Sequence, residues 1–257
     1  MPDHDGPPRA PRALRVCALY PELMNIYADR GNLLVLERRC AWRGIAFELG
    51  SSGPGEPLAA YAHDLFYLGG GQDRDQRLCA EDLVETKRDG LHAAAARGAV
   101  VLGVCGGYQL LGRSYVLGEE QIPGVGLLDI ETVRVEGSRL IGNVAIEVSL
   151  DGPAAEVGPR VLAGFENHGG RTRLRGGQQA LGRVLKGYGN DGHSGMEGAR
   201  RGNTIGTYLH GPLLPKNVWF ADWLIARALG LRPDELAPLD DAFERAAHGS
   251  ALAAAGV

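Results

Sequence analysis

The sequence predicts an α/β protein with an open, mostly parallel sheet flanked by helices. Three observations support this fold. Short apolar, β-branched runs alternate with helical stretches in the first half, two of these runs end in glycine clusters, and 257 residues with 44% hydrophobic content can form a sizeable core. Strands buried on both faces of a parallel sheet are continuous apolar runs, and ligands bind at their carboxyl ends. We therefore expect a ligand site at that edge.

The first half shows the alternation most clearly. Residues 1–12 hold four prolines and no apolar period, which predicts a disordered leader before a single domain at 13–247. Asn32 is expected to cap the first helix, and the second helix contains a possible break near Gly90. Strands are predicted at 14–19, 45–49, 64–68 and 99–102, and helices at 33–43 and 75–97.

The second half is richer in glycine-punctuated β runs, which we expect to extend the sheet or add a smaller antiparallel layer. Closing helices follow at 217–229 and 233–247, the first with Trp219, Trp223 and Leu224 facing inward, and residues 248–257 are predicted to be a frayed tail. The predicted strands are 131–135, 143–148, 161–165, 182–186 and 204–209.

Composition excludes several classes of protein. The net charge of -4 argues against a surface for nucleic acid or anionic membranes. No stretch approaches the roughly 18 apolar residues of a membrane span. The four cysteines are widely spaced, so neither a metal centre nor a disulfide framework is predicted, and a reducing cytoplasm fits best. Residues 187–192 match G-x-G-x-x-G but lack the following helix that a dinucleotide site requires.

The stretch 99–112 has the form of a nucleophile elbow. An apolar strand runs into Gly103-Val104-Cys105-Gly106-Gly107 and then turns helical, which gives the G-x-nucleophile-x-G pattern with cysteine as the nucleophile. A helix N-terminus favours the thiolate form of such a cysteine. The alternative is that Cys105 is a small buried core residue.

A cysteine nucleophile needs a base, usually a histidine. Of the seven histidines, His168 and His210 remain after those in predicted tails, in exposed segments and in the glycine-rich stretch 187–203 are set aside. His210 is the better candidate, because it ends an apolar run and precedes Gly-Pro. A strand-end histidine can also be a structural hydrogen-bonding group.

Several ordered blocks carry a family resemblance. Together with the elbow and His210, they resemble the class I glutamine amidotransferases, their cobyric-acid-synthase-like branch, and within it the glutaminase subunits of lipid II isoglutaminyl synthases. This resemblance implies a flavodoxin-like fold. The blocks are GVCGGYQ at 103–109, LYPELMN at 19–25, DRGN at 29–32, GGGQDR at 69–74, GFENHGGRT at 164–172 and GTYLHGP at 206–212.

The resemblance implies hydrolysis of L-glutamine through a γ-glutamyl thioester on Cys105, with His210 as the proton carrier. The N–H groups of Gly106 and of the glycine loop, here Gly71, would hold the oxyanion. Gln109 and Arg139 match positions that bind glutamine in the family, and an Arg suits an α-carboxylate. Arg139 could equally be a solvated charge at a strand end.

The sequence departs from the family where most members have a glutamate two residues after the histidine. Pro212 stands there. Either Glu166 or another carboxylate orients His210, or a partner subunit supplies the acid, which is the reading we favour. Asp222 is the first acidic residue after Pro212.

A partner is also implied by the fate of the ammonia. Amide synthesis needs ATP, yet the chain has no G-x-x-x-x-G-K-[ST] loop. The resemblance implies a Mur-ligase-like (MurT-like) subunit that carries ATP and Mg²⁺ and amidates the D-glutamate of lipid II at the inner face of the cytoplasmic membrane. No cofactor or metal is expected in this chain. Two alternatives stay open: a stand-alone cysteine hydrolase, and a non-catalytic subunit whose Cys105 senses oxidation.

Overall fold

The computed structural model describes residues 12–25, 30–150 and 160–257. The predicted leader at 1–12 lies outside these residues, except for Arg12. The elements in chain order are β1 Ala13–Leu19, α1 Arg30–Ala41, β2 Ala46–Ser52, β3 Leu65–Leu68, α2 Asp73–Asp82, the π-helix η1 Leu83–Lys87, α3 Arg88–Ala96, β4 Val100–Val104, α4 Gly106–Leu111, β5 Ser114–Leu117, β6 Glu120–Pro123, β7 Ile130–Arg134, β8 Leu140–Val148, β9 Arg160–His168, β10 Gly170–Leu174, β11 Gly182–Lys186, β12 Met196–Glu197, β13 Ala199–Arg201, β14 Thr204–Thr207, α5 Leu213–Lys216, α6 Val218–Ala228, the 3₁₀ turn η3 Pro233–Glu235 and α7 Ala242–Ala255.

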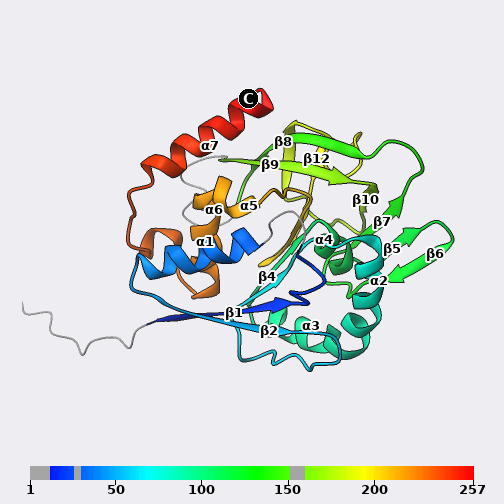
Figure 1. Cartoon of the computed structure of the whole chain (residues 1–257), viewed down its shortest axis with the longest axis horizontal. Helices are drawn as coiled ribbons and strands as arrows, with labels where there is room; N and C mark the ends of the chain where they lie inside the picture. Colours follow the sequence, from blue (N-terminus) through cyan, green and yellow to red (C-terminus); the bar gives the residue numbers. More distant parts are fainter. Residues whose placement is uncertain (1–11, 26–29, 151–159) are drawn as a thin grey trace, which may run out of the picture.

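A six-stranded sheet organises the molecule, in the order β13-β14-β4-β3-β1-β2. All its pairs are parallel except β13 with β14. Helices α1 and α6 lie on one side of this sheet and α2 and α3 on the other (Figure 1). β3 and β4 are buried throughout, because both their faces are covered. The predicted open, mostly parallel α/β sheet is therefore confirmed.

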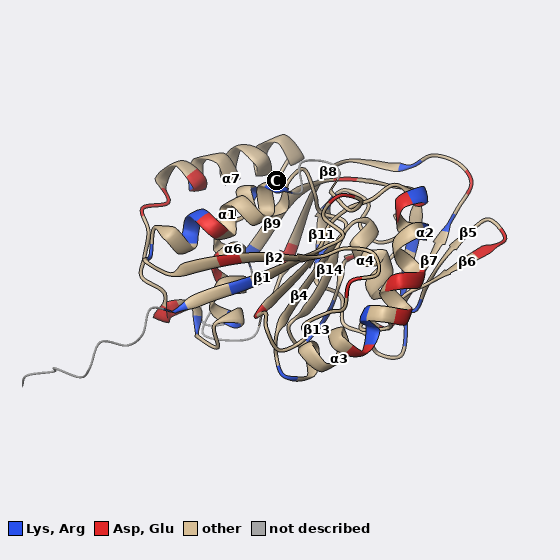
Figure 2. Cartoon of the chain, turned by 60° about the horizontal axis from the view of Figure 1, so that its bottom comes forward, with Lys and Arg blue, Asp and Glu red and all other residues tan. Residues whose placement is uncertain are grey.

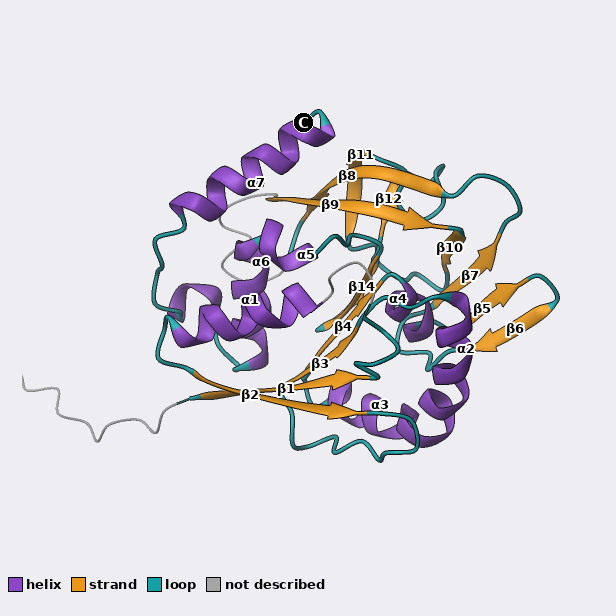
Figure 3. Ribbon diagram, viewed as in Figure 1, coloured by secondary structure: helices purple, strands orange, loops and turns teal. Residues whose placement is uncertain are grey.

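Two further four-stranded sheets lie at the carboxyl end of the main sheet (Figure 3). One has the order β10-β7-β5-β6, with only β5 and β7 parallel, and the other is antiparallel in the order β12-β11-β8-β9. The sequence predicted both an extended sheet and an added β layer as alternatives, and the structure contains both. β13 and β14 extend the main sheet, and the other strands form the added layer.

The first helix starts earlier than predicted. Asn32 is not a helix cap but lies within α1, fully buried, where its side chain donates to the Tyr67 hydroxyl at 2.9 Å. Its side-chain oxygen also accepts from the Leu214 N–H at 2.8 Å. These distant partners outweigh the capping preference of asparagine. Asn32 therefore joins α1 to the sheet and to the segment that follows His210.

The predicted helix at 75–97 is also more irregular than expected. It begins at Asp73, and its regular geometry is interrupted by the π-turn at Leu83–Lys87 rather than at Gly90, which lies inside α3. The Lys87 ammonium is fully buried there and forms an ion pair with Asp82. The Asp82 carboxylate also accepts a hydrogen bond of 2.6 Å from the Tyr20 hydroxyl.

The end of the chain corrects two predictions. Residues 233–247 do not form one helix, because only η3 and the start of α7 are helical there. Residues 248–257 are not a frayed tail, because α7 continues to Ala255 and is anchored by a 2.9 Å hydrogen bond from Asn143 Nδ2 to the Ala254 carbonyl. The predicted helix at 217–229 is confirmed as α6, with Trp223 and Leu224 buried.

A buried charge network connects the helices on one side of the sheet. Arg39 of α1 is 1% exposed and donates to Asp222 of α6 at 2.5 Å and to Asp241, the residue before α7, at 2.9 Å. Arg43 also donates to Asp222 at 2.8 Å. Both arginines thus bind Asp222, and the bond from Arg39 joins α6 to α1.

Acidic and basic residues are interspersed along α2 and α3 (Figure 2). Within the described part of the chain, no helix is long and apolar enough to cross a membrane. Among the same residues, no group of three or more His, Cys, Asp or Glu side chains could hold a metal ion.

Candidate active site

The predicted elbow is present between β4 and α4. Cys105 follows the last residue of β4 and has φ +53° and ψ -107°, a strained backbone conformation for a residue with a side chain. Its N–H donates to the Thr207 carbonyl at 2.8 Å, and its carbonyl accepts from the Gln109 N–H at 3.2 Å. The sheet and the helix thus hold the strained residue from both sides.

The flanking glycines allow this turn to pack. A Cβ at Gly107 would overlap the Leu68 carbonyl oxygen, and one at Gly103 would lie 2.9 Å from the Gly107 carbonyl oxygen. Any larger residue at these positions would push α4 away from β3 and β4. The close packing at this turn therefore requires glycine at both positions.

The predicted oxyanion donors lie next to each other. A Cβ at Gly106 would be 3.0 Å from the Gly71 backbone nitrogen, so the glycine loop after β3 approaches the first residue of α4 closely. Gln76 Nε2 donates to the Gly71 carbonyl at 3.2 Å, and the Met24 sulfur packs against Gly71. These contacts fix the loop beside Cys105.

Cys105 and His210 come from neighbouring parallel strands. β4 pairs with β14 up to Val104 and Thr207, so both residues lie at the carboxyl edge of the sheet. His210 and Phe165 exchange two backbone hydrogen bonds of 3.0 Å, which fix His210 against β9. The structure thus brings the two predicted catalytic residues to one edge.

His210 is 1% exposed, and its surroundings favour the neutral ring. Burial is the main cause that lowers the pKa of His210 to about 4, and electrostatic interaction with His168, Lys216 and Arg139 lowers it further. A neutral imidazole can accept a proton. The imidazolium that results would need a compensating negative charge.

Neither carboxylate considered from the sequence is directed at His210. Phe165 is the residue paired with His210, so the side chain of Glu166 points to the opposite face of β9. There it accepts hydrogen bonds from the N–H groups of Tyr188 at 2.6 Å and Gly189 at 2.9 Å. Asp222 belongs to the arginine network of the helices.

A second buried carboxylate, Glu197 of β12, supports the strand that leads to His210. It accepts hydrogen bonds from the Tyr208 N–H at 2.6 Å and the Thr207 hydroxyl at 2.9 Å. Burial raises the pKa of Glu197 to about 8, and the nearby Glu166 contributes to the shift. No motif or spacing along the chain indicated this support.

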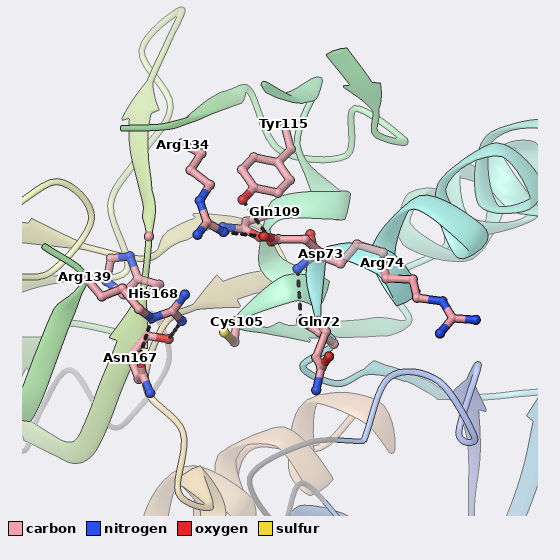
Figure 4. A pocket seen from close by; sticks show the side chains of 13 residues that line it. Gln72, Asp73, Arg74, Cys105, Gln109, Tyr115, Arg134, Arg139, Asn167 and His168 are labelled. Atoms are coloured by element: carbon pink, nitrogen blue, oxygen red, sulfur yellow. Dashed lines mark hydrogen bonds and ion pairs between the residues drawn. The ribbon is translucent and has the colours of Figure 1, made fainter. Parts of the chain in front are cut away.

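A pocket of about 400 Å³ opens above Cys105 (Figure 4). Cys105, Gln109, Arg139 and Gly71 of the predicted site line it, whereas Gly106 and the buried His210 are not among its lining residues. Its other lining residues are Gln72, Asp73, Arg74, Gln76, Tyr115, Arg134, Asn167, His168 and Gly169.

The predicted substrate residues differ in their environment. Arg139 donates to the side-chain oxygen and the carbonyl of Asn167, both at 2.7 Å, which holds its guanidinium at the pocket. Gln109 is almost fully buried, and its Nε2 donates to the Tyr208 hydroxyl at 3.1 Å. Tyr208 in turn stacks on His168 with ring centroids 3.6 Å apart. Gln109 is therefore part of the pocket wall and of the core beneath it.

Sequence reasoning missed Asp73, Tyr115 and Arg134. The Asp73 carboxylate pairs with Arg134 and accepts a hydrogen bond of 3.1 Å from the Tyr115 hydroxyl. Asp73 belongs to the block GGGQDR and stands two residues after the last of the three glycines, which was a usable signal. Arg134 and Tyr115 are on strands of the added layer and carried no such signal.

The other three cysteines have a different environment. Cys17, Cys40 and Cys79 are at most 1% exposed. Burial raises the pKa of Cys17 to about 11 and that of Cys40 and Cys79 to about 12. Cys105 is the one cysteine among the residues that line the pocket.

The open, mostly parallel sheet with a strained cysteine at its carboxyl edge has the fold found in class I glutamine amidotransferases. This fold is shared with the solved structure of PurLQS from Thermotoga maritima, at a TM-score of 0.57 and 22% identity, covering 86% of this chain and 95% of that one. Residues 15–218 match the CobB/CobQ-like glutamine amidotransferase domain, and the chain belongs to this family.

Two curated relatives narrow the comparison. Lipid II isoglutaminyl synthase (glutamine-hydrolyzing) subunit GatD of Staphylococcus aureus (strain N315) is 38% identical over 206 residues, which is 80% of each chain. The subunit of the same name from Streptococcus pneumoniae (strain ATCC BAA-255 / R6) is 34% identical over 220 residues, 85% of this chain and 82% of the relative. The resemblance predicted from the ordered blocks is confirmed.

Proposed function

We propose that this chain is the glutaminase subunit of a lipid II isoglutaminyl synthase. In this function it hydrolyses L-glutamine at Cys105 and passes the ammonia to an ATP-dependent partner. The main support is the strained Cys105, which opens into a pocket that also contains the Arg139 guanidinium. The names of the two curated relatives support the same assignment.

The chemistry follows from the residues at the elbow. Cys105 Sγ attacks the side-chain amide carbon of glutamine, and His210 takes the thiol proton and delivers it to the departing nitrogen, so that ammonia leaves and a γ-glutamyl thioester remains. Water then attacks the thioester with His210 as the base, and the proton returns to the sulfur as glutamate leaves. The low pKa of His210 keeps its ring neutral and able to accept the thiol proton, but it also weakens the ring as a base, so the imidazolium formed in this step would need a nearby negative charge.

Backbone amides and polar side chains would hold the substrate. The N–H groups of Gly106 and Gly71 would donate to the tetrahedral oxyanion, and the loss of one such donor typically costs about 3 kcal/mol of transition-state stabilisation. Arg139 would bind the α-carboxylate through its planar guanidinium. Gln109 would complete the wall of the substrate pocket.

The partner would supply the acid that orients His210. Pro212 stands where most of the family has a glutamate, Glu166 is bonded to the Tyr188 and Gly189 amides, and Asp222 is bonded to Arg39 and Arg43. A carboxylate from another chain would stabilise the imidazolium that burial disfavours. Glutaminase activity would then depend on assembly.

The partner would also use the ammonia. We infer a MurT-like, Mur-ligase-like subunit that holds ATP and Mg²⁺ and activates the α-carboxyl of D-glutamate in lipid II, which ammonia converts to D-isoglutamine. This chain would need no cofactor of its own. The complex would act at the inner face of the cytoplasmic membrane, where lipid II is its substrate.

The test is ammonia release from L-glutamine by the full chain, with and without a coexpressed Mur-ligase-like partner. We expect activity in the complex and a loss of at least about 1,000-fold in Cys105→Ala, because the nucleophile is removed. Cys79→Ala is the matched control, since Cys79 is buried away from the pocket.

The outcomes separate the alternatives. No ammonia from glutamine with intact Cys105, in either preparation, would contradict the proposal and favour a redox-sensing or binding subunit. Equal hydrolysis of unrelated amides or esters without any partner would favour a stand-alone cysteine hydrolase. Activity retained in Cys105→Ala would place the nucleophile elsewhere.

A further inference from the structure

We propose that Asp73 binds the α-ammonium group of the amino-acid substrate and thereby selects free glutamine over amides that lack this group. The inference rests on the proposed function, because it concerns the same pocket. Among the described residues that line the pocket, Asp73 is the one with an acidic side chain.

The chemistry of the substrate requires two opposite charges around its α-carbon. Glutamine is a zwitterion, so its carboxylate fits a guanidinium and its ammonium fits a carboxylate. Arg139 and Asn167 line one side of the pocket, Asp73 lies on the other, and Cys105 lies between these two groups (Figure 4). A glutamine whose amide reaches Cys105 can thus present its two α-substituents to opposite walls.

The Asp73 carboxylate is held in place before substrate arrives. The Tyr115 hydroxyl donates to Asp73 Oδ1 at 3.1 Å, and Arg134 forms an ion pair with Oδ2. A carboxylate offers about four acceptor positions, so these two bonds leave room for an ammonium donor. The side chain is 33% exposed, and it borders the pocket.

Three elements fix this arrangement. Asp73 is the first residue of α2, Tyr115 is on β5, and Arg134 ends β7. The added β layer therefore supplies both groups that orient the carboxylate, which gives this layer a role in substrate selection. A preorganised carboxylate binds a cation without paying a reorientation cost.

A competing role is that Asp73 only positions Arg134, which would then bind the substrate carboxylate together with Arg139. The two roles differ for a substrate without an amino group. Loss of an ammonium subsite affects glutamine alone, whereas loss of Arg134 positioning affects every substrate that carries the carboxylate.

The experiment compares L-glutamine with glutaramate, which is glutamine without its α-amino group, on the assembled complex. We expect Asp73→Asn to lower kcat/KM for glutamine roughly 10- to 100-fold, because hydrogen bonds to charged groups are lost, and to change that for glutaramate less than about threefold. Most of the loss should lie in KM. The ratio of the two losses measures the ammonium contact.

Asp75→Asn is the matched control, since it removes the same charge from the first turn of α2 but does not line the pocket. Tyr115→Phe, which removes one bond to Asp73, should lower the preference for glutamine in the same direction but less, and it tests the proposal independently if Asp73→Asn folds poorly.

Equal losses on both substrates, or a loss on neither, would overturn the role of Asp73. These results differ from a failure of the proposed function, in which the unsubstituted complex itself releases no ammonia from glutamine.

Discussion

The environment of His210 decides how its charge depends on pH. In the folded chain its pKa lies at about 4, and in the unfolded chain it returns to about 6.5. As the pH falls below about 6.5, the unfolded state binds a proton that the folded state binds only near pH 4. Protonation therefore favours unfolding, and the stability present above pH 6.5 is lost as the pH falls to about 4.

We expect the free energy of unfolding to fall by about 3 kcal/mol more in the unsubstituted chain than in His210→Asn between pH 7 and pH 4. Urea unfolding of the isolated chain across this range measures the difference. His193→Asn, at an exposed position, is the control and should follow the unsubstituted chain. The same pH dependence in His210→Asn would show that His210 does not cause it.

Among the single residues of the candidate site, the sequence predicted those that stand in a recognisable local pattern. Cys105 stands in a glycine cluster after a strand, and His210 ends another strand, so both were found. Asp73 acquires its surroundings only when β5 and β7 pack beside α2, and no spacing along the chain encodes that contact. The roles of the site residues remain predictions.

Among the elements, the short helix α4 depends most on small residues. A Cβ at Gly107 would overlap the Leu68 carbonyl oxygen, and the Gly107 N–H donates to the Gly69 carbonyl at 3.0 Å. Gly107→Ala would force α4 away from β3 and from the glycine loop. We expect the free energy of unfolding to fall by about 3 kcal/mol. Glutaminase activity should fall further than the loss of folded protein alone would explain.

Gly142→Ala is the control for this substitution. Gly142 lies in β8 with open space where a Cβ would stand, and its backbone φ is not in the left-handed region. The free energy of unfolding of Gly142→Ala should differ from that of the unsubstituted chain by no more than about 0.5 kcal/mol. A Gly107→Ala variant as stable as Gly142→Ala would contradict the packing that we describe.

The helices and strands were predicted correctly where an apolar run in the sequence marks a buried strand. They were predicted less well where hydrogen bonds between distant residues determine where an element begins or ends. β1, β3, β4 and β11 are apolar or bounded by glycine and were predicted within a residue or two. α1 begins at Arg30 because Asn32 bonds across the fold, which its capping preference could not reveal. The two-residue β12 and three-residue β13 are too short to carry a periodic signal.

For the whole molecule, the network around Arg39 joins α1, α6 and α7. Arg39→Met would leave Asp241 without its buried partner and Asp222 with Arg43 alone. We expect a loss of about 3 kcal/mol in stability, because breaking a buried pair strands a charge. Hydrogen exchange should accelerate along α7 before it does in the main sheet.

Arg38→Met is the control, because Arg38 is the exposed neighbour of Arg39 on the same helix. It should leave both stability and exchange nearly unchanged. If α7 exchanges equally slowly in Arg39→Met, the network does not hold this helix.

The overall architecture was predictable because alternating strands and helices with glycine-ended strands allow few topologies. The sequence left open whether the later strands extend the sheet or form a new layer. They do both, because β14 pairs with β4 in the main sheet while the strands from β5 to β12 form two separate sheets. Whether a later strand extends the main sheet or joins a new one depends on which strand edges lie together in the folded chain, and the local sequence does not encode this.

Because Cys17, Cys40 and Cys79 are buried, we expect Cys105 to be the one cysteine of the folded protein that reacts readily with electrophiles. These thiols are shielded, and their high pKa values keep them protonated at neutral pH, whereas Cys105 borders an open pocket. A chain with four cysteines thus behaves as a single-thiol protein. A small alkylating molecule would report the state of the elbow without any need to remove the other cysteines.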